Sequence, residues 1–165
     1  RERQRDQAVG LHLLAQRDEV VPGRRDLIAL GLEHALVVED HPSIRKTLAH
    51  LLRSHCYLCT AASGRDALKQ IKHKSPDVIL LDLNLSDMDG LEIARLVRRN
   101  ETTSRIPILA MSGSCSTMDK IKSLEMGCND FIHKPFSVPT LFVRLSALIP
   151  IRSCSLNQDN SLRTK

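Results

Sequence analysis

The sequence predicts an α/β fold built on a doubly wound parallel sheet with five strands and five helices. Between residues 35 and 150, short apolar runs alternate five times with stretches whose apolar residues recur at helical spacing. Alternating strands and helices are typical of parallel sheets that carry helices on both faces. Five such units in one domain match a flavodoxin-like topology with the strand order 2-1-3-4-5.

The expected elements follow one another regularly along the chain. Strands are expected at residues 35–38, 56–61, 77–83, 106–112 and 130–133. Helices are expected to begin at residues that favour a first turn or an N-cap, namely Pro42, Ser63, Ser116 and Ser137, and after Gly90. Ser75-Pro76 should end the second helix and Gly127 the fourth. The last helix carries a continuous apolar stripe, which predicts that it packs on the sheet.

The segments outside residues 35–150 have weaker patterns. Residues 1–34 show little periodicity and are interrupted by Pro22-Gly23, so we expect a linker or an accessory helical extension. Residues 151–165 are rich in Ser and Asn, which predicts a disordered tail.

Composition argues against several classes of protein. The net charge is +5, but no segment concentrates it, and aromatic residues make up only 2% of the chain, so direct nucleic-acid binding is not supported. No apolar run approaches the roughly 18 residues that a membrane span needs, and we see no signal-peptide core. A cytoplasmic location is therefore expected.

The chain has five cysteines, and this odd number predicts free thiols. Cys56 and Cys59 have the spacing of a redox motif. However, residues three apart on a strand point to opposite faces, so we expect two ordinary core residues and no reactive pair.

Polar residues stand where four of the predicted strands end. Glu39 and Asp40 follow the first strand, Asp82 lies at the end of the third, Ser112 ends the fourth and Lys134 follows the fifth. Parallel strands joined by right-handed crossovers place their carboxyl ends at one edge, where ligands of open α/β sheets bind. Each residue alone has an ordinary interpretation as a cap, turn or solvated charge. Together they predict a site.

The chemistry of these five residues is consistent with phosphoryl transfer onto Asp82. Neighbouring carboxylates repel one another, and a hard divalent cation such as Mg²⁺ offsets that repulsion. An aspartate can act as a nucleophile towards phosphorus. A metal ion, an ammonium and a hydroxyl are suitable partners for phosphoryl oxygens.

These motifs resemble those of the response-regulator receiver domain of two-component signalling. The resemblance covers residues 35–150 and lies in four motifs, which occur in the family's order: Glu39-Asp40, LLDLNLSDMDG around Asp82, MSGS around Ser112, and the Lys134-Pro135-Phe136 triplet. It implies a phospho-acceptor signalling module whose only reactions are self-phosphorylation and slow autodephosphorylation.

The resemblance also implies a role for each matching residue. Asp82 would be the phospho-acceptor, and Glu39 and Asp40 would hold Mg²⁺, with Asp40 as the more direct ligand. The backbone carbonyl of Asn84 and the carboxylate of Asp82 would complete the protein ligands of the metal. Lys134 would pair with the phosphoryl group, next to a Lys134–Pro135 bond that is cis in the family.

Three further positions follow from the same resemblance. Ser112 would hydrogen-bond the phosphoryl group and shift inward, and Phe131 would be the aromatic switch residue, which reports by ring burial because Phe has no hydroxyl. Gly90 would allow the turn after the third strand. Ser86 departs from the family, where many members carry Pro, so we expect a slightly less rigid loop. Asp87 and Asp89 are expected to be turn and cap residues.

The implied phosphoryl donor is a histidine kinase or a phosphotransfer protein. An output partner would dock on the face formed by the fourth helix, fifth strand and fifth helix. A stand-alone regulator and the C-terminal receiver of a hybrid sensor kinase both remain open.

A haloacid-dehalogenase-like phosphatase is a weaker alternative, because Asn84 cannot act as the general acid that such enzymes need two residues after the nucleophile. A flavin-binding protein would need a Ser/Thr/Gly-rich loop after the first strand, where this chain has EDHPS.

Overall fold

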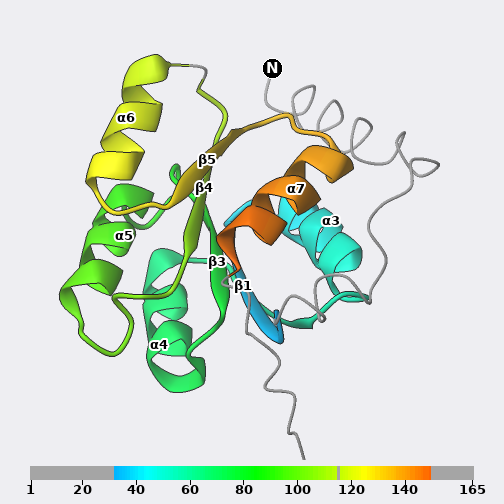
Figure 1. Cartoon of the computed structure of the whole chain (residues 1–165), viewed down its shortest axis with the longest axis horizontal. Coiled ribbons are helices and arrows are strands. Elements are labelled where there is room, and N and C mark those ends of the chain that lie inside the picture. The colour runs from blue at the N-terminus through cyan, green and yellow to red at the C-terminus, as the bar shows by residue number, and fades with distance from the viewer. Residues whose placement is uncertain (1–31, 115, 150–165) are drawn as a thin grey trace, which may run out of the picture.

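A computed structural model describes residues 32–114 and 116–149, which form the predicted alternation of strands and helices (Figure 1). The strands are β1 (His34–Val38), β2 (Tyr57–Ala61), β3 (Val78–Asp82), β4 (Ile108–Ser112) and β5 (Asp130–His133). The helices are α3 (Pro42–Leu52), α4 (Gly64–Lys74), α5 (Gly90–Arg99), α6 (Thr117–Glu125) and α7 (Val138–Leu148). Most of the predicted linker or extension, and the predicted tail, lie outside the described residues.

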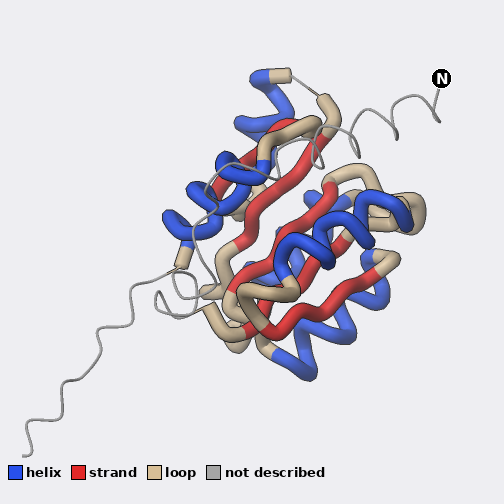
Figure 2. Tube along the Cα trace, turned by 90° about the vertical axis from the view of Figure 1, so that its right-hand side faces the viewer, coloured by secondary structure: helices blue, strands red, loops and turns tan. Residues whose placement is uncertain are grey.

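The strands form one parallel sheet in the predicted order β2-β1-β3-β4-β5, and Figure 2 shows helices on both of its sides. The strand order reverses between β1 and β3, which makes this the switch point of the fold. In the sheet register, Val38 pairs with Leu81, Asp82 with Met111 and Ser112 with His133. The polar strand-end residues therefore lie at the last paired position or one to two residues beyond it, along a single edge.

Two apolar clusters hold the helices against the sheet. One cluster joins α3 and α7 to one face, with Leu48, Leu52, Leu141, Phe142 and Leu145 among its buried residues. The other joins α4 and α5 to the opposite face, with Ala67, Ile71, Ile93, Ala94 and Val97. Every residue of β3 and β4 is buried because both of their faces are covered. This explains why their sequences are almost continuously apolar.

The predicted helix starts are confirmed. The side chains of Ser63, Ser116 and Ser137 each accept a hydrogen bond from a backbone amide in the first turn of their helix. Pro42 is the first residue of α3. Gly127 has a φ of 102°, a left-handed conformation that suits glycine just after the end of α6.

Several predicted boundaries were wrong by one or two residues. β1 begins at His34, and the buried core already includes Leu32. The carboxylate of Asp77 holds the start of β1 by accepting hydrogen bonds from the backbone amides of Glu33 and His34. β4 begins at Ile108 rather than residue 106, because Pro107 has no amide to donate to the sheet. The third helix was expected over residues 91–97, whereas α5 runs from Gly90 to Arg99.

The cysteine prediction is confirmed for the residues that the structure describes. Cys56 immediately precedes β2 and packs on the α3–α7 cluster, whereas Cys59 packs on the α4–α5 cluster. Cys56, Cys59 and Cys128 are free thiols. Burial raises the pKa of Cys56 to about 11 and that of Cys128 to about 11, which keeps both protonated near neutral pH. Cys115 and Cys154 lie outside the described residues.

Within residues 32–114 and 116–149, none of the helices is both long enough and apolar enough to cross a lipid bilayer.

Candidate functional site

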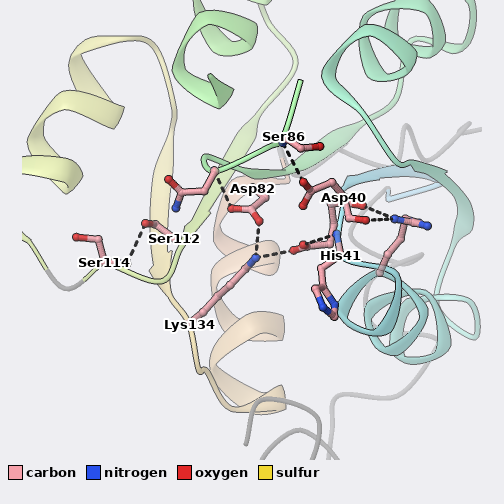
Figure 3. A network of polar contacts seen from close by, with 10 residues as sticks. Asp40, His41, Asp82, Ser86, Ser112, Ser114 and Lys134 are labelled. Carbon is pink, nitrogen blue, oxygen red and sulfur yellow. Dashed lines mark hydrogen bonds and ion pairs between the residues drawn. The ribbon is translucent and has the colours of Figure 1, made fainter. Parts of the chain in front are cut away.

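The structure brings the predicted strand-end residues together at the carboxyl edge of the sheet (Figure 3). Glu39 and Asp40 leave β1, Asp82 ends β3, and Lys134 follows β5. One carboxylate oxygen from each of Glu39, Asp40 and Asp82 lies within 4.8 Å of the other two. Residues separated by up to 95 positions in sequence thus form one cluster.

Lys134 lies at the centre of this cluster. Its Nζ donates a hydrogen bond to Oε2 of Glu39 and another, of 2.8 Å, to Oδ2 of Asp82. All three side chains are buried, so these charge-assisted hydrogen bonds are screened little by water. The ammonium therefore compensates part of the negative charge that the carboxylates bring to the edge.

Burial and charge act in opposite directions on this group of residues. Burial raises the pKa of Glu39, and the nearby Asp82 adds to this effect, while Lys134 and its hydrogen bond partly counteract it. Burial alone would lower the pKa of Lys134, but the two carboxylates and their hydrogen bonds outweigh it and raise that pKa. Lys134 is therefore held in its charged form.

The three carboxylates could hold a divalent cation. Together with Lys134 they carry a surplus of negative charge, and carboxylate oxygens are the ligands that Mg²⁺ prefers. The backbone amide of Asn84 donates a 3.0 Å hydrogen bond to Oδ1 of Asp82, which fixes the orientation of that carboxylate. Asn84 thus contacts the predicted phospho-acceptor through its backbone, while the predicted role of its carbonyl as a metal ligand stays a prediction.

The structure adds two sets of contacts, made by Arg45 and Ser86, that the sequence pattern did not reveal. Arg45, in the first turns of α3, donates hydrogen bonds of 2.7 and 2.9 Å to the backbone carbonyls of Glu39 and Asp40. The backbone amide of Ser86 donates a 2.9 Å hydrogen bond to Oδ2 of Asp40. No sequence signal identified these contacts, because one uses backbone carbonyls as acceptors and the other a backbone amide as donor.

Ser112 contacts this cluster through its backbone, whereas its hydroxyl oxygen is held by a neighbouring residue of its own loop. Its hydroxyl oxygen accepts a 3.1 Å hydrogen bond from the amide of Ser114, and its carbonyl accepts one of 2.7 Å from the amide of Lys134. Phe131, the predicted switch residue, is buried in the α4–α5 cluster. The structure thus defines one position for each residue, and the predicted movement of Ser112 and Phe131 stays a prediction.

The loop that follows Asp82 is held at several points. Asp89 caps α5, as predicted, by accepting a hydrogen bond from the amide of Leu91. Asp87 is also a cap, but it caps α4, accepting hydrogen bonds of 2.8 and 3.1 Å from the amides of Gly64 and Arg65. These hydrogen bonds lower the pKa of Asp87 and keep it ionised. The prediction that Ser86 loosens this loop stays untested.

Two features implied by the resemblance are present. Glycine is needed at position 90 because a Cβ there would lie 2.5 Å from the backbone oxygen of Asp82. The requirement for glycine therefore comes from the close approach of two backbone segments. The Lys134–Pro135 peptide bond is cis.

Comparison with known proteins agrees with this arrangement. Residues 35–146 match the family described as the response regulator receiver domain. The phosphate regulon transcriptional regulatory protein PhoB of Pseudomonas aeruginosa is 38% identical over 115 residues, which are 69% of this chain and 50% of that protein. The chain thus spans about half the length of the curated relatives that it matches first.

Solved structures with the same fold include two informative cases. Chemotaxis protein CheY4 of Vibrio cholerae has 31% identity and a TM-score of 0.67, with 71% of this chain and 98% of that chain covered. The receiver domain of sensor histidine kinase PA1611 from Pseudomonas aeruginosa, solved with a magnesium ion in the active site cleft, has 30% identity and a TM-score of 0.66, with coverages of 71% and 97%. By motif, fold and sequence, this chain belongs to the response regulator receiver domain family, whose members are phospho-acceptor signalling domains.

Proposed function

We propose that Asp82 accepts a phosphoryl group from a histidine kinase or a phosphotransfer protein, with Mg²⁺ bound by the neighbouring carboxylates, and that this modification switches partner binding. One observation carries the proposal. The buried ammonium of Lys134 contacts the carboxylates of both Glu39 and Asp82, and one oxygen of Asp40 lies within 4.8 Å of one oxygen of each of them. A site for an incoming phosphoryl group explains this combination of three carboxylates and one ammonium better than a purely structural ion pair does.

The proposed step is a displacement at phosphorus. A carboxylate oxygen of Asp82 attacks the phosphorus atom, the bond from phosphorus to the donor's leaving group breaks, and the leaving group departs with the bonding electron pair. An acyl phosphate then remains on Asp82. A histidine nitrogen that leaves takes up a proton from solvent, whereas the acetate released from acetyl phosphate stays ionised.

The residues around Asp82 would each stabilise the added charge. Glu39, Asp40 and Asp82, with the carbonyl of Asn84, would hold Mg²⁺, which supplies positive charge opposite the phosphoryl oxygens. Lys134 would exchange its contact with the Asp82 carboxylate for one with the phosphoryl group. The oxygen ligands suit Mg²⁺, and the ammonium of Lys134 suits the negatively charged phosphoryl group.

Ser112 would couple phosphorylation to a change of conformation. Its hydroxyl oxygen accepts a hydrogen bond from Ser114, so the hydroxyl proton can still be donated to a phosphoryl oxygen. A shift of Ser112 toward Asp82 would change the packing around Phe131, which lies on the neighbouring strand β5. Phosphorylation would thus bias an equilibrium between two arrangements of this region.

An output partner is proposed to dock on the face formed by α6, β5 and α7. Helix α6 buries only Ser123 among the residues of its span, and it exposes Met118, Ile121 and Leu124. On α7, Val143 is 65% exposed. Exposed apolar side chains of this kind support a protein contact.

The proposed cellular location and the proposed loss of the phosphoryl group are those expected for the family. We propose that the domain works in the cytoplasm and loses its phosphoryl group slowly by autodephosphorylation. Receiver domains occur both in a transcriptional regulator and in a sensor histidine kinase among the proteins compared above. The neighbouring coding sequence would decide between these settings.

The proposed phosphorylation can be tested directly. The protein is incubated with acetyl phosphate and Mg²⁺, and intact mass spectrometry is expected to show one added phosphoryl group that hydroxylamine removes. Asp82→Asn should show no adduct, while the matched control Asp119→Asn, in α6 outside the site, should be modified like wild type. An equal adduct on Asp82→Asn, or none on wild type with acetyl phosphate and a phosphorylated kinase, would contradict the proposal. Sustained turnover of small phosphomonoesters would favour a phosphatase instead.

A further inference from the structure

A hydrogen bond joins the two loops that carry the candidate metal ligands. The backbone amide of Ser86 donates to Oδ2 of Asp40 over 2.9 Å, and the two residues are 46 positions apart in sequence. Asp40 belongs to the loop between β1 and α3, and Ser86 to the loop between β3 and α5 (Figure 3). The donor is a backbone group, so the serine side chain takes no part.

The loop that carries Ser86 is anchored on both sides of this amide. Before it, the amide of Asn84 donates to Oδ1 of Asp82. After it, the carboxylate of Asp87 accepts hydrogen bonds from two amides at the start of α4. The amide of Ser86 is therefore presented to Asp40 from a constrained backbone.

The position of Asp40 is constrained from its backbone as well. Arg45 holds the carbonyl of Asp40, so the main chain and one carboxylate oxygen are both fixed. The carboxylate has two oxygens, and only Oδ2 is engaged by Ser86. Oδ1 of Asp40 is not engaged by Ser86, and one oxygen of Asp40 lies within 4.8 Å of one oxygen each of Glu39 and Asp82.

We propose that the backbone amide of Ser86 is a positioning group for the Mg²⁺ site. It holds one oxygen of Asp40, so that this carboxylate offers a single oriented oxygen to the metal, and it sets the separation of the two ligand-bearing loops. This inference rests on the Mg²⁺ site proposed above. Hydrogen bonds to metal ligands of this kind raise affinity because less orientational freedom is lost when the metal binds.

The test uses two substitutions at one position. Ser86→Pro removes the amide hydrogen, whereas Ser86→Ala removes the hydroxyl and keeps the amide, so it is the matched control. Isothermal titration calorimetry with MgCl₂ should give a dissociation constant about three- to tenfold larger for Ser86→Pro than for wild type. This increase is at or below the low end of what is typical when a group that hydrogen-bonds a metal ligand is removed. Ser86→Ala should match wild type.

A kinetic measurement separates positioning from general damage. Phosphorylation by acetyl phosphate is followed as a function of Mg²⁺ concentration. Ser86→Pro should need about three- to tenfold more Mg²⁺ for half-maximal rate, with a saturating rate close to that of wild type. A lower saturating rate with unchanged Mg²⁺ dependence would overturn the proposal.

A second variant guards against disruption of the loop by the proline ring. Replacing the Leu85–Ser86 amide by an ester in semisynthetic protein removes only the N–H, and it should reproduce the weaker Mg²⁺ binding. Unchanged or tighter binding in the ester variant would overturn the inference. Failure of wild type to bind Mg²⁺ would instead contradict the proposed function, so the two failures can be told apart.

Discussion

The buried ammonium of Lys134 provides the most informative perturbation of this domain. The side chain of Glu39 is only 1% exposed and that of Lys134 only 9%. Lys134→Met keeps a long apolar stem and removes the charge, together with the hydrogen bonds to Glu39 and Asp82. The variant leaves two carboxylates at the edge of the sheet without their cation.

The expected loss of stability is large for one substitution. Removing one partner of a buried ion pair costs about 3–5 kcal/mol, because the remaining charge is left without compensation. Here two carboxylates lose their partner, but the folded protein no longer has to bury an ammonium, and Glu39 can take up a proton. We therefore expect the free energy of unfolding to fall by about 3 kcal/mol near neutral pH without Mg²⁺.

The loss should depend on pH in a defined direction. Burial already raises the pKa of Glu39, and Lys134 lowers it, so removal of Lys134 raises that pKa further. A carboxyl group with a raised folded-state pKa binds its proton more tightly in the folded protein, so stability increases as the pH falls through that pKa. The deficit of Lys134→Met should therefore shrink as the pH falls through the raised pKa of Glu39.

In wild type, the folded-state pKa of Lys134 is raised above its ordinary value of 10.5. The stability contributed by Lys134 is therefore present below that ordinary value and is lost as the pH rises through the higher folded-state pKa.

Urea unfolding followed by circular dichroism, with EDTA and with saturating Mg²⁺, measures these effects. Mg²⁺ should recover more stability in Lys134→Met than in wild type, because the cation replaces the missing charge. Lys120→Met, an exposed position in α6, is the matched control and should change stability by less than about 0.5 kcal/mol. A deficit below about 1 kcal/mol, or one that is independent of pH, would refute the reasoning, since it would mean that the pair behaves like a solvated one.

Three further predictions test other parts of the site. Gly90→Ala should destabilise the domain by about 1–3 kcal/mol in urea unfolding, because its Cβ would lie 2.5 Å from the backbone of Asp82, while Gly113→Ala, which has no neighbouring atom within 4 Å, should be nearly neutral. Asp87→Ala should lower the melting temperature near neutral pH; since the folded-state pKa of Asp87 is lowered, this difference should disappear in acid as the carboxyl protonates. Ser112→Ala should still be phosphorylated by mass spectrometry, but phosphorylation should change hydrogen exchange in α6 less than in wild type, and an identical response would contradict the proposed coupling.

Much of the fold could be predicted because it depends on patterns that are local in sequence. The apolar runs of β3 and β4, and the capping serines at positions 63, 116 and 137, identified elements that the structure contains. Errors were confined to element ends, where single contacts decide the boundary. Pro107 shortened β4, and the side chain of Asp77 extended the start of β1.

The candidate site was likewise predictable in part from the sequence. Parallel topology brings all strand ends to one edge, so Glu39, Asp40, Asp82 and Lys134 could be grouped before any coordinates existed. The same topology brings Ser112 to this edge, and in the structure its hydroxyl oxygen accepts a hydrogen bond from the amide of Ser114. Topology predicts proximity, but it does not predict which atoms meet.

The sequence by itself determined the alternation of strands and helices, the order of the sheet and the residue types gathered at its carboxyl edge. Only the tertiary structure decided that Lys134 contacts both Glu39 and Asp82, that the amide of Ser86 holds Asp40, and that Asp87 caps a helix 22 positions earlier. The physical reason is that periodicity and capping act within a few residues. Hydrogen bonds between distant loops instead depend on angles and distances of about 3 Å, and backbone donors are identical at nearly every position.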